Sequence, residues 1–316
     1  MLHLRLIVPP DRTEAAVALI ERTVGTTHLV VLPGCARDPA GDLVLCDVAR
    51  ESGDELLQAI RELKVDQDGS IAVESIDLSL SKRATEAEEE APGEAADAVL
   101  WEQLTDATHE ESTLSVTYSA FMILATMIAA CGVVLDNAVL IVGAMAVGPE
   151  FGPLAGICTG IVRGAPRLVL RSLTALLVGF AAAIAATTLF SVGMDALDLF
   201  SRERLDADRP NTGFIWQPDP FSFVVALLAG AAGTLSLTST KSGALIGVAI
   251  SVTTVPAAAN AAVALSYGEF GQMWGSVEQL LLNLLGIILA GTATLVAQKL
   301  LWRTQRGQWL RGNRRV

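Results

Sequence analysis

The sequence has few charged residues and few side chains of the kind that bind metals. Charged residues make up only 18% of its 316 residues, and the chain has three histidines and four cysteines. The cysteines form no CxxC pair and the histidines have no ligand spacing, so we expect neither a metal site nor a cofactor. We interpret the cysteines as reduced, small apolar residues; they are Cys35, Cys46, Cys131 and Cys158.

The sequence also lacks common catalytic motifs. It contains no GxSxG or HExxH motif, and no paired aspartates lie on its apolar segments. A glycine-rich phosphate loop of the Walker or Rossmann form is missing as well, so no motif indicates nucleotide binding. We therefore expect a protein that is not an enzyme and has no catalytic residues.

Charge is unevenly distributed along the chain. The formal net charge is −12, with acidic residues crowded into residues 51–111 and a basic tail at 302–316. The acidic N-terminal part argues against nucleic acid as a partner. In the tail, we interpret the arginines as a topology signal and a contact for anionic lipid headgroups; they are Arg303, Arg306, Arg311, Arg314 and Arg315.

Long apolar runs dominate the second part of the chain, and hydrophobic residues make up 52% of the whole. Each run is close to the roughly 20 residues that a helix needs to cross a bilayer. The sequence therefore predicts a six-helix transmembrane domain over residues 114–301. The six expected spans are 114–135, 138–162, 168–193, 221–239, 242–265 and 277–301.

Charges in the short loops predict the orientation. Residues 1–10 read MLHLRLIVPP and do not resemble a secretory signal, so we expect a cytoplasmic N-terminus. The loop after the second span carries Arg163, Arg167 and Arg171, and the loop after the fourth carries Lys241. Cytoplasmic loops are rich in Lys and Arg, so this pattern predicts a multi-pass protein of the plasma (inner) membrane with both termini in the cytoplasm.

Residues 1–80 have the pattern of a small soluble domain. Alternating apolar strands and two amphipathic helices occur in the order β-α-β-β-α-β, which is typical of ferredoxin-like domains. Such a domain could serve in docking and assembly or could bind a regulatory ligand, for which Asp11, Arg12, Asp47 and Arg50 are candidate contacts. An acidic linker and a helix leading to the membrane are expected over residues 81–113. The whole chain is thus predicted to be α+β.

The transmembrane region contains an internal repeat. LIVGAMAVGPEFGPLAG follows the first span, and ALIGVAISVTTVPAAAN follows the fourth. Each unit, 114–193 and 221–301, has three spans, and an odd number of spans reverses the direction of the chain. The sequence therefore predicts 3+3 inverted repeats, a plan that recurs in transporters.

Helix-breaking residues interrupt the second expected span. The stretch VGAMAVGPEFGPLAG places Pro149, Glu150 and Pro153 inside an apolar run. Proline removes a helical hydrogen bond, and a carboxylate in lipid is costly, so we expect an interrupted helix whose acid faces a cavity. Two alternatives are a salt bridge of Glu150 with Arg163 near the cytoplasmic end and simple proline kinks in a packed bundle.

The matching stretch of the second half should face this interruption at the interface between the repeats. Its polar groups could add neutral ligands to a path for a solute or ion. The candidate path residues are Gly148, Pro149, Glu150, Gly152, Pro153, Ser251, Thr253, Thr254, Pro256 and Asn260.

Both stretches resemble a known family. IVGAMAVGPEFGPLAG and GTLSLTSTKSGALIGVAISVTTVPAAAN are similar to the domain-of-unknown-function family 389 of hydrophobic bacterial membrane proteins. This resemblance covers residues 1–301 and implies a membrane protein without implying an activity.

Two functions are compatible with these patterns. The first is a transporter or channel for a small solute or ion, which the cytoplasmic domain could gate. The second is a membrane-anchored sensor whose cytoplasmic domain binds a small metabolite or nucleotide. Small-residue helix faces and exposed sheet edges also predict a homo-oligomer in the lipid bilayer.

Overall fold

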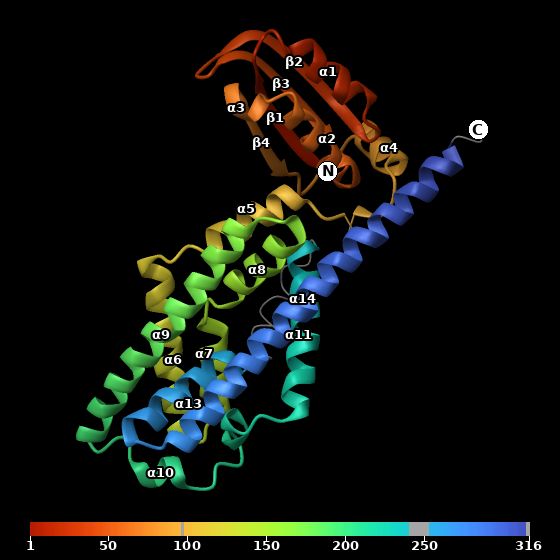
Figure 1. Cartoon of the computed structure of the whole chain (residues 1–316). Coiled ribbons are helices and arrows are strands. Elements are labelled where there is room, and N and C mark those ends of the chain that lie inside the picture. The colour runs from red at the N-terminus through yellow and green to blue at the C-terminus, as the bar shows by residue number, and fades with distance from the viewer. Residues whose placement is uncertain (96–97, 240–252, 314–316) are drawn as a thin grey trace. The chain divides into compact units, whose positions relative to one another are not determined.

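The computed structural model describes residues 1–95, 98–239 and 253–313, with side chains up to Trp302 (Figure 1). The chain divides into two compact units. One consists of Met1–Glu102 with Gln298–Val316, and the other of Gln103–Ala297. Helix α5 (Trp101–Glu111) and helix α14 (Phe270–Asn313) each belong partly to both units.

The first unit contains a four-stranded antiparallel sheet. Its strands are β1 (Leu2–Val8), β2 (Thr26–Arg37), β3 (Ala40–Val48) and β4 (Ser70–Ser75), in the order β2-β3-β1-β4. Alternate residues of β1 are buried, as expected when one face of a strand packs on a core.

Two helices supply the rest of this core. Helix α1 (Thr13–Arg22) contributes Ala16 and Ile20, and α2 (Arg50–Glu62) contributes Leu56 and Ile60. The element order matches the predicted β-α-β-β-α-β order, with one added short helix, α3 (Val65–Asp68). The predicted α+β class is confirmed.

The acidic segment after the sheet differs from the expected linker. Residues Lys82–Glu90 form helix α4, capped by the Ser81 side chain, which accepts a hydrogen bond from the Ala84 N–H. Its small residues Ala84 and Ala87 are buried, and the helix packs against β2 and β3. The glutamates lie on the outer side of the helix, which explains why composition alone predicted a solvated chain.

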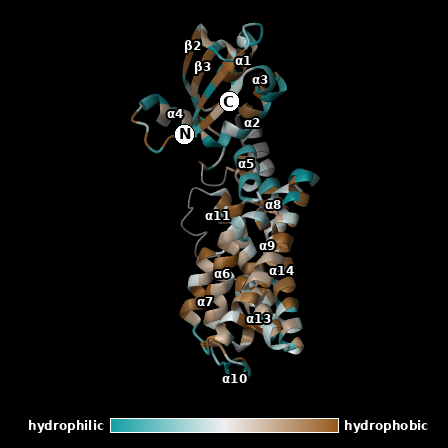
Figure 2. Cartoon of the chain, turned by 90° about the vertical axis from the view of Figure 1, so that its left-hand side faces the viewer, coloured by the Kyte–Doolittle hydropathy of each residue, from teal (hydrophilic) through white to brown (hydrophobic). Residues whose placement is uncertain are grey.

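The second unit is helical. After α5 come α6 (Val116–Val134), α7 (Ala138–Val147), α8 (Phe151–Arg163), α9 (Pro166–Ala196) and α10 (Arg202–Asp206). A short 3-10 helix η2 (Gly213–Trp216) then precedes α11 (Pro220–Thr238), α13 (Thr254–Tyr267) and α14. Figure 2 shows the apolar colouring of α6, α7 and α9.

Four helices of the described chain are long and apolar enough to cross a membrane: α6, α9, α11 and the part of α14 over Phe270–Trp302. The pair α7 and α8 together also pass this test, which gives up to five spans. The predicted second span is therefore a bent helix pair. The first part of the predicted span 242–265 lies outside the described residues, and α13 forms the rest.

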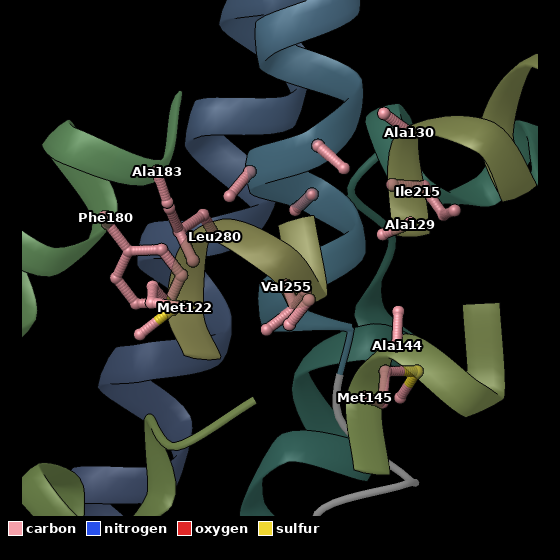
Figure 3. Packing of buried hydrophobic residues seen from close by; sticks show 14 of the residues in the cluster. Met122, Ala129, Ala130, Ala144, Met145, Phe180, Ala183, Ile215, Val255 and Leu280 are labelled. Carbon is pink, nitrogen blue, oxygen red and sulfur yellow. The ribbon is translucent and has the colours of Figure 1, made fainter. Parts of the chain in front are cut away.

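Helix α13 lies inside the bundle. It packs against α6, α7 and α9, and every residue from Thr254 to Ala264 is buried. Most of these residues are alanine, because a small side chain allows neighbouring helices to approach closely. Figure 3 shows Val255 among the buried side chains, with Ala144 and Met145 of α7 on one side and Met122 of α6 on the other.

Candidate functional site

The break between α7 and α8 is the centre of the candidate site. Helix α7 ends at Val147, α8 begins at Phe151, and the two are bent by 52°. Pro149 cannot donate to the helical ladder, whereas Pro153 lies in the first turn of α8, where proline is tolerated. The sequence thus predicted this interruption correctly.

The break lies level with the first turn of α6 and near the middle of the longer α9, because Tyr118 lies close to both Glu150 and Gly179. At about 1.5 Å per residue, α7 rises roughly 15 Å, about half the roughly 28 Å of α6, against which it packs. Gly148 and Pro149 carry the chain somewhat further before Glu150. This carboxylate interacts electrostatically with Tyr118, which lies in the first turn of α6.

Glu150 is buried, with only 5% of its surface exposed. Its Oε1 accepts a hydrogen bond of 2.7 Å from the Thr254 hydroxyl, at the first residue of α13. Its Oε2 has no hydrogen-bond partner. Glu150 forms no ion pair within the described chain, so the alternative salt bridge with Arg163 is not observed.

Glycines allow the close approach of the chain at this point. A Cβ added to Gly148 would lie 2.3 Å from Glu150 Oε2 and 2.8 Å from Val255 Cγ2. A Cβ added to Gly152 would lie 2.6 Å from the Cβ of Glu111. The glycines therefore admit the carboxylate and α13 on one side and α5 on the other.

The two proline-bearing segments that the sequence pattern matched to each other meet here, through Glu150 with Thr254 and Gly148 with Val255. Thr253, just before α13, accepts a hydrogen bond of 2.9 Å from Asn283 Nδ2 of α14. Pro256 lies in the first turn of α13 and is buried. Ser251, the remaining candidate of this stretch, lies outside the described residues.

Asn260 belongs to a second polar cluster, further along α13. It is fully buried, and its Oδ1 accepts a hydrogen bond of 2.9 Å from the guanidinium of Arg209. Its Nδ2 donates to Ser276 Oγ at 2.8 Å, while Arg209 also donates to Gln272 Oε1 at 2.8 Å. The structure therefore does not bring Asn260 to Glu150.

Sequence reasoning missed Arg209. The loop 194–220 mixes basic and acidic residues, so its charge pattern did not single out Arg209. No periodic pattern predicts that a loop residue is buried. In the structure only 6% of Arg209 is exposed. Burial lowers the pKa of its guanidinium, and the Asp136 carboxylate acts in the opposite direction.

The four candidate ligand contacts of the first unit do not form one site. Arg12 binds Asp68 at 2.7 Å and the carbonyl oxygens of Leu63 and Lys64, and Asp11 is exposed beside it. Asp47, near the end of β3, and Arg50, just after β3, lie at the opposite end of the sheet from Asp11 and Arg12, because β1 and β3 are antiparallel. The Arg50 side chain donates to the Ala98 carbonyl.

Two histidines flank Asp47, a grouping that the sequence did not reveal. His3 Nδ1 and His28 Nδ1 each lie 2.7 Å from one of its carboxylate oxygens. The strand register places His3 opposite Asp47, and His28 lies next to Thr27, whose partner is also Asp47. Residues far apart in sequence meet here only because of strand pairing.

Comparison with known proteins agrees with the sequence motifs. The family model "Domain of unknown function (DUF389)" matches residues 145–289. The resemblance to DUF389 is confirmed. The uncharacterized protein MJ0678 of Methanocaldococcus jannaschii is 26% identical over 207 residues, which cover 64% of this chain and 61% of that protein. No solved structure matches the chain.

The DUF389 match falls on the candidate site. Residues 145–289 include the α7–α8 break, Glu150, the described start of α13 and Asn283. The sheet of the first unit lies outside the match. The chain spans 61% of the length of this relative, less than two thirds.

Proposed function

We propose that this protein is a membrane transporter or channel for a small cation, with Glu150 at the α7–α8 break as its central binding group. A single observation carries this proposal: a buried carboxylate at a helix interruption, with one oxygen bonded to the opposite segment and the other unpaired. Broken helices near the middle of a membrane domain are a recurring binding plan of transporters.

The chemistry of the break favours a cation. A buried carboxylate oxygen is only an acceptor when ionised, and leaving it unpaired costs about 1–3 kcal/mol or more. A proton or a metal cation bound to Glu150 would remove that cost. Backbone carbonyls released by Pro149 and Pro153 would supply further oxygen ligands.

The arrangement of helices supports the 3+3 inverted repeat. Both halves begin with a 19-residue helix, α6 and α11, and both end with a much longer one, α9 and α14. Between them lies an interrupted element in the first half and α13 in the second. In this plan, the contact between Glu150 and Thr254 lies at the centre that the two repeats share.

The test is flux in proteoliposomes, with Na⁺, K⁺ and H⁺ each followed by an ion-sensitive dye. We expect Glu150→Gln to lower the flux of the transported ion by at least about tenfold or to flatten its pH dependence, since it removes the central charge. Thr254→Val keeps the shape of the side chain, removes only the hydrogen bond, and should have a smaller effect.

Glu278→Gln is the matched control. Glu278 lies on α14, but its side chain is exposed, so the same loss of charge should leave flux unchanged. Size-exclusion chromatography checks that each variant is folded. Equal flux and equal pH profiles for the wild type and Glu150→Gln would refute the role of Glu150.

The remaining features of the proposal concern the whole protein. The sheet order β2-β3-β1-β4 with α1 and α2 packed in one core supports a ferredoxin-like domain. We propose that it lies in the cytoplasm, where it could gate transport, and that the protein is a multi-pass homo-oligomer of the plasma membrane. Its role as a metabolite or nucleotide sensor stays a prediction, because Arg12, Asp47 and Arg50 are engaged within the domain.

A further inference from the structure

A pocket of about 240 Å³ lies between η2, α11, α13 and α14. Its polar lining consists of Asp219, Ser222, Thr253 and Asn283, and Phe214 and Phe221 are among the apolar residues around them. A cavity in a membrane domain that is both roomy and polar can hold water or a hydrated solute.

The polar groups form a gradient from the surface to the interior. Asp219, at the N-terminus of α11, is exposed, Thr253 is partly buried, and Asn283 is 1% exposed. Asn283 donates to Thr253, and the next residue, Thr254, donates to Glu150. The inner wall of the pocket is therefore one residue away from the group that binds Glu150.

The charge of the pocket is negative. Hydrogen bonds from the side chain and backbone of Ser222 lower the pKa of Asp219, so the carboxylate stays ionised at neutral pH. No lysine, arginine or histidine is among the described residues that line the pocket. A single negative charge at the mouth of a cavity attracts cations and repels anions.

The ligand set fits a monovalent cation. Asp219 is the one carboxylate in the described lining, and the other groups are neutral oxygens and an amide. No group of three or more His, Cys, Asp or Glu suited to a metal ion occurs in the described part of the chain. Ca²⁺ sites commonly use several carboxylates among six to eight oxygens, which this pocket does not offer.

We infer that this pocket is the access site for a small monovalent cation on its way to Glu150. The inference rests on the proposed function, and it assigns to Asp219, Thr253 and Asn283 a role in admitting the ion. Beyond Asn283, the buried Gln279 Oε1 is also unpaired, so it offers a further oxygen one turn of α14 away.

The test measures the electrostatics of the pocket without relying on transport. Val225 lines the pocket and is 44% exposed, whereas its neighbour Val224 is 48% exposed and does not line it. Val225→Cys and Val224→Cys therefore form a matched pair. In lipid nanodiscs, each is treated with a cationic or an anionic methanethiosulfonate reagent, and mass spectrometry follows modification of that peptide.

The expected result is that Val225→Cys reacts about tenfold faster with the cationic reagent than with the anionic one. Adding Asp219→Asn should remove most of this preference, and asparagine still caps α11. Val224→Cys should react slowly with both reagents, because it faces lipid. Protection of Val225→Cys by Na⁺ or K⁺ at constant ionic strength would assign the pocket to alkali ions, and an intact charge preference without protection would assign it to protons.

A lack of charge preference at Val225→Cys, or a preference that survives Asp219→Asn, would overturn the inference. A pocket that is simply a lipid-filled groove gives this result. The outcome is separate from that of the flux experiment. A charge preference at Val225→Cys, combined with flux that Glu150→Gln does not change, would support a cation-binding pocket and would refute Glu150 as the group to which it leads.

Discussion

At the residue scale, Gly148 is a tightly packed position of the candidate site, because an added side chain there would meet both the acid and α13. Glycine at this position leaves room for Glu150 Oε2 and the Val255 side chain, both nearer than 3 Å to the position of an added Cβ. A methyl group there must move backbone, the carboxylate or α13. The glycine is thus needed for the contact between the two halves.

Gly148→Ala should therefore destabilise the protein by about 1–3 kcal/mol, the usual cost of overpacking. Gly143→Ala is the matched control, because a Cβ on Gly143 of α7 meets no atom within 4 Å. Alanine in that helix should be neutral or stabilising by about 0.5–1 kcal/mol. Thermal unfolding in detergent measures both, and equal melting temperatures for the two variants would contradict the tight contact at Gly148.

Asp42 offers a test of pH dependence in the first unit. The Thr13 hydroxyl and the Gly34 N–H each donate to its carboxylate at 2.7 Å, and these hydrogen bonds lower its pKa from the ordinary 3.8. A lowered pKa in the folded state contributes stability above the unfolded value, and the contribution is lost as the pH falls through the folded value.

Thr13→Val removes the hydrogen bond that has the larger effect on the pKa of Asp42. It should lower the melting temperature at pH 7. The difference in melting temperature between variant and wild type should narrow at pH 3, which is below the ordinary pKa of 3.8 and closer to the lowered pKa of the folded state. Thermal unfolding of residues 1–92 at both pH values measures this. A difference that is as large at pH 3 as at pH 7 would show that Thr13 stabilises the fold by packing alone.

Some site residues could be predicted from the sequence and some could not. Glu150 was predictable because an acid between two prolines violates the pattern of an apolar span. Thr254 was predictable only through the repeat. The burial of Arg209 depends on how its loop folds, and the two histidines meet Asp47 because of the strand register. Neither can be predicted from a local sequence pattern.

At the element scale, the sequence predicted helices well where a long apolar run marked the helix and a proline marked its interruption, as at α7 and α8. Helix α4 was missed because its composition is that of a solvated chain. Only its alanines face the sheet, and Gly25, with a φ of +87°, lies against Ala87 and Ala91. Small residues bury little surface and give a weak sequence signal.

Residues 1–92 should consequently be more stable than residues 1–80. Burial of Ala84, Ala87 and Ala91 is expected to contribute roughly 1–2 kcal/mol after the cost of ordering the helix. Chemical denaturation of the two fragments measures the difference. Within residues 1–92, Ala87→Asp should remove most of this added stability. Glu89→Ala, at an exposed position, should leave it unchanged. Equal stability of the two fragments would show that α4 does not contribute to this domain.

At the scale of the whole molecule, the main question is whether the α7–α8 pair crosses the membrane or returns to the side it came from. The turn before α7 lies beside the loop after α9, since Asp136 accepts hydrogen bonds from Asn211 and Thr212. The start of α9 lies at the other end of the bundle, where Ser172 contacts Ser112. Helix α9 has 31 residues and is roughly 46 Å long, so α7 and α8 together must traverse the bundle.

We therefore expect three crossings, by α6, the α7–α8 pair and α9, between the first unit and the loop that carries α10, and an odd number would put these two parts on opposite sides of the membrane. A re-entrant α7–α8 pair would leave two crossings and put them on the same side. Native Cys35 is exposed in the first unit, and Glu203 is exposed in α10. A membrane-impermeant maleimide added to intact cells should label Glu203→Cys in a Cys35→Ser background, whereas Cys35 of the wild type should react only after permeabilisation. Labelling of both cysteines in intact cells, or of neither, would show an even number of crossings and would remove the inverted topology on which the central position of Glu150 depends.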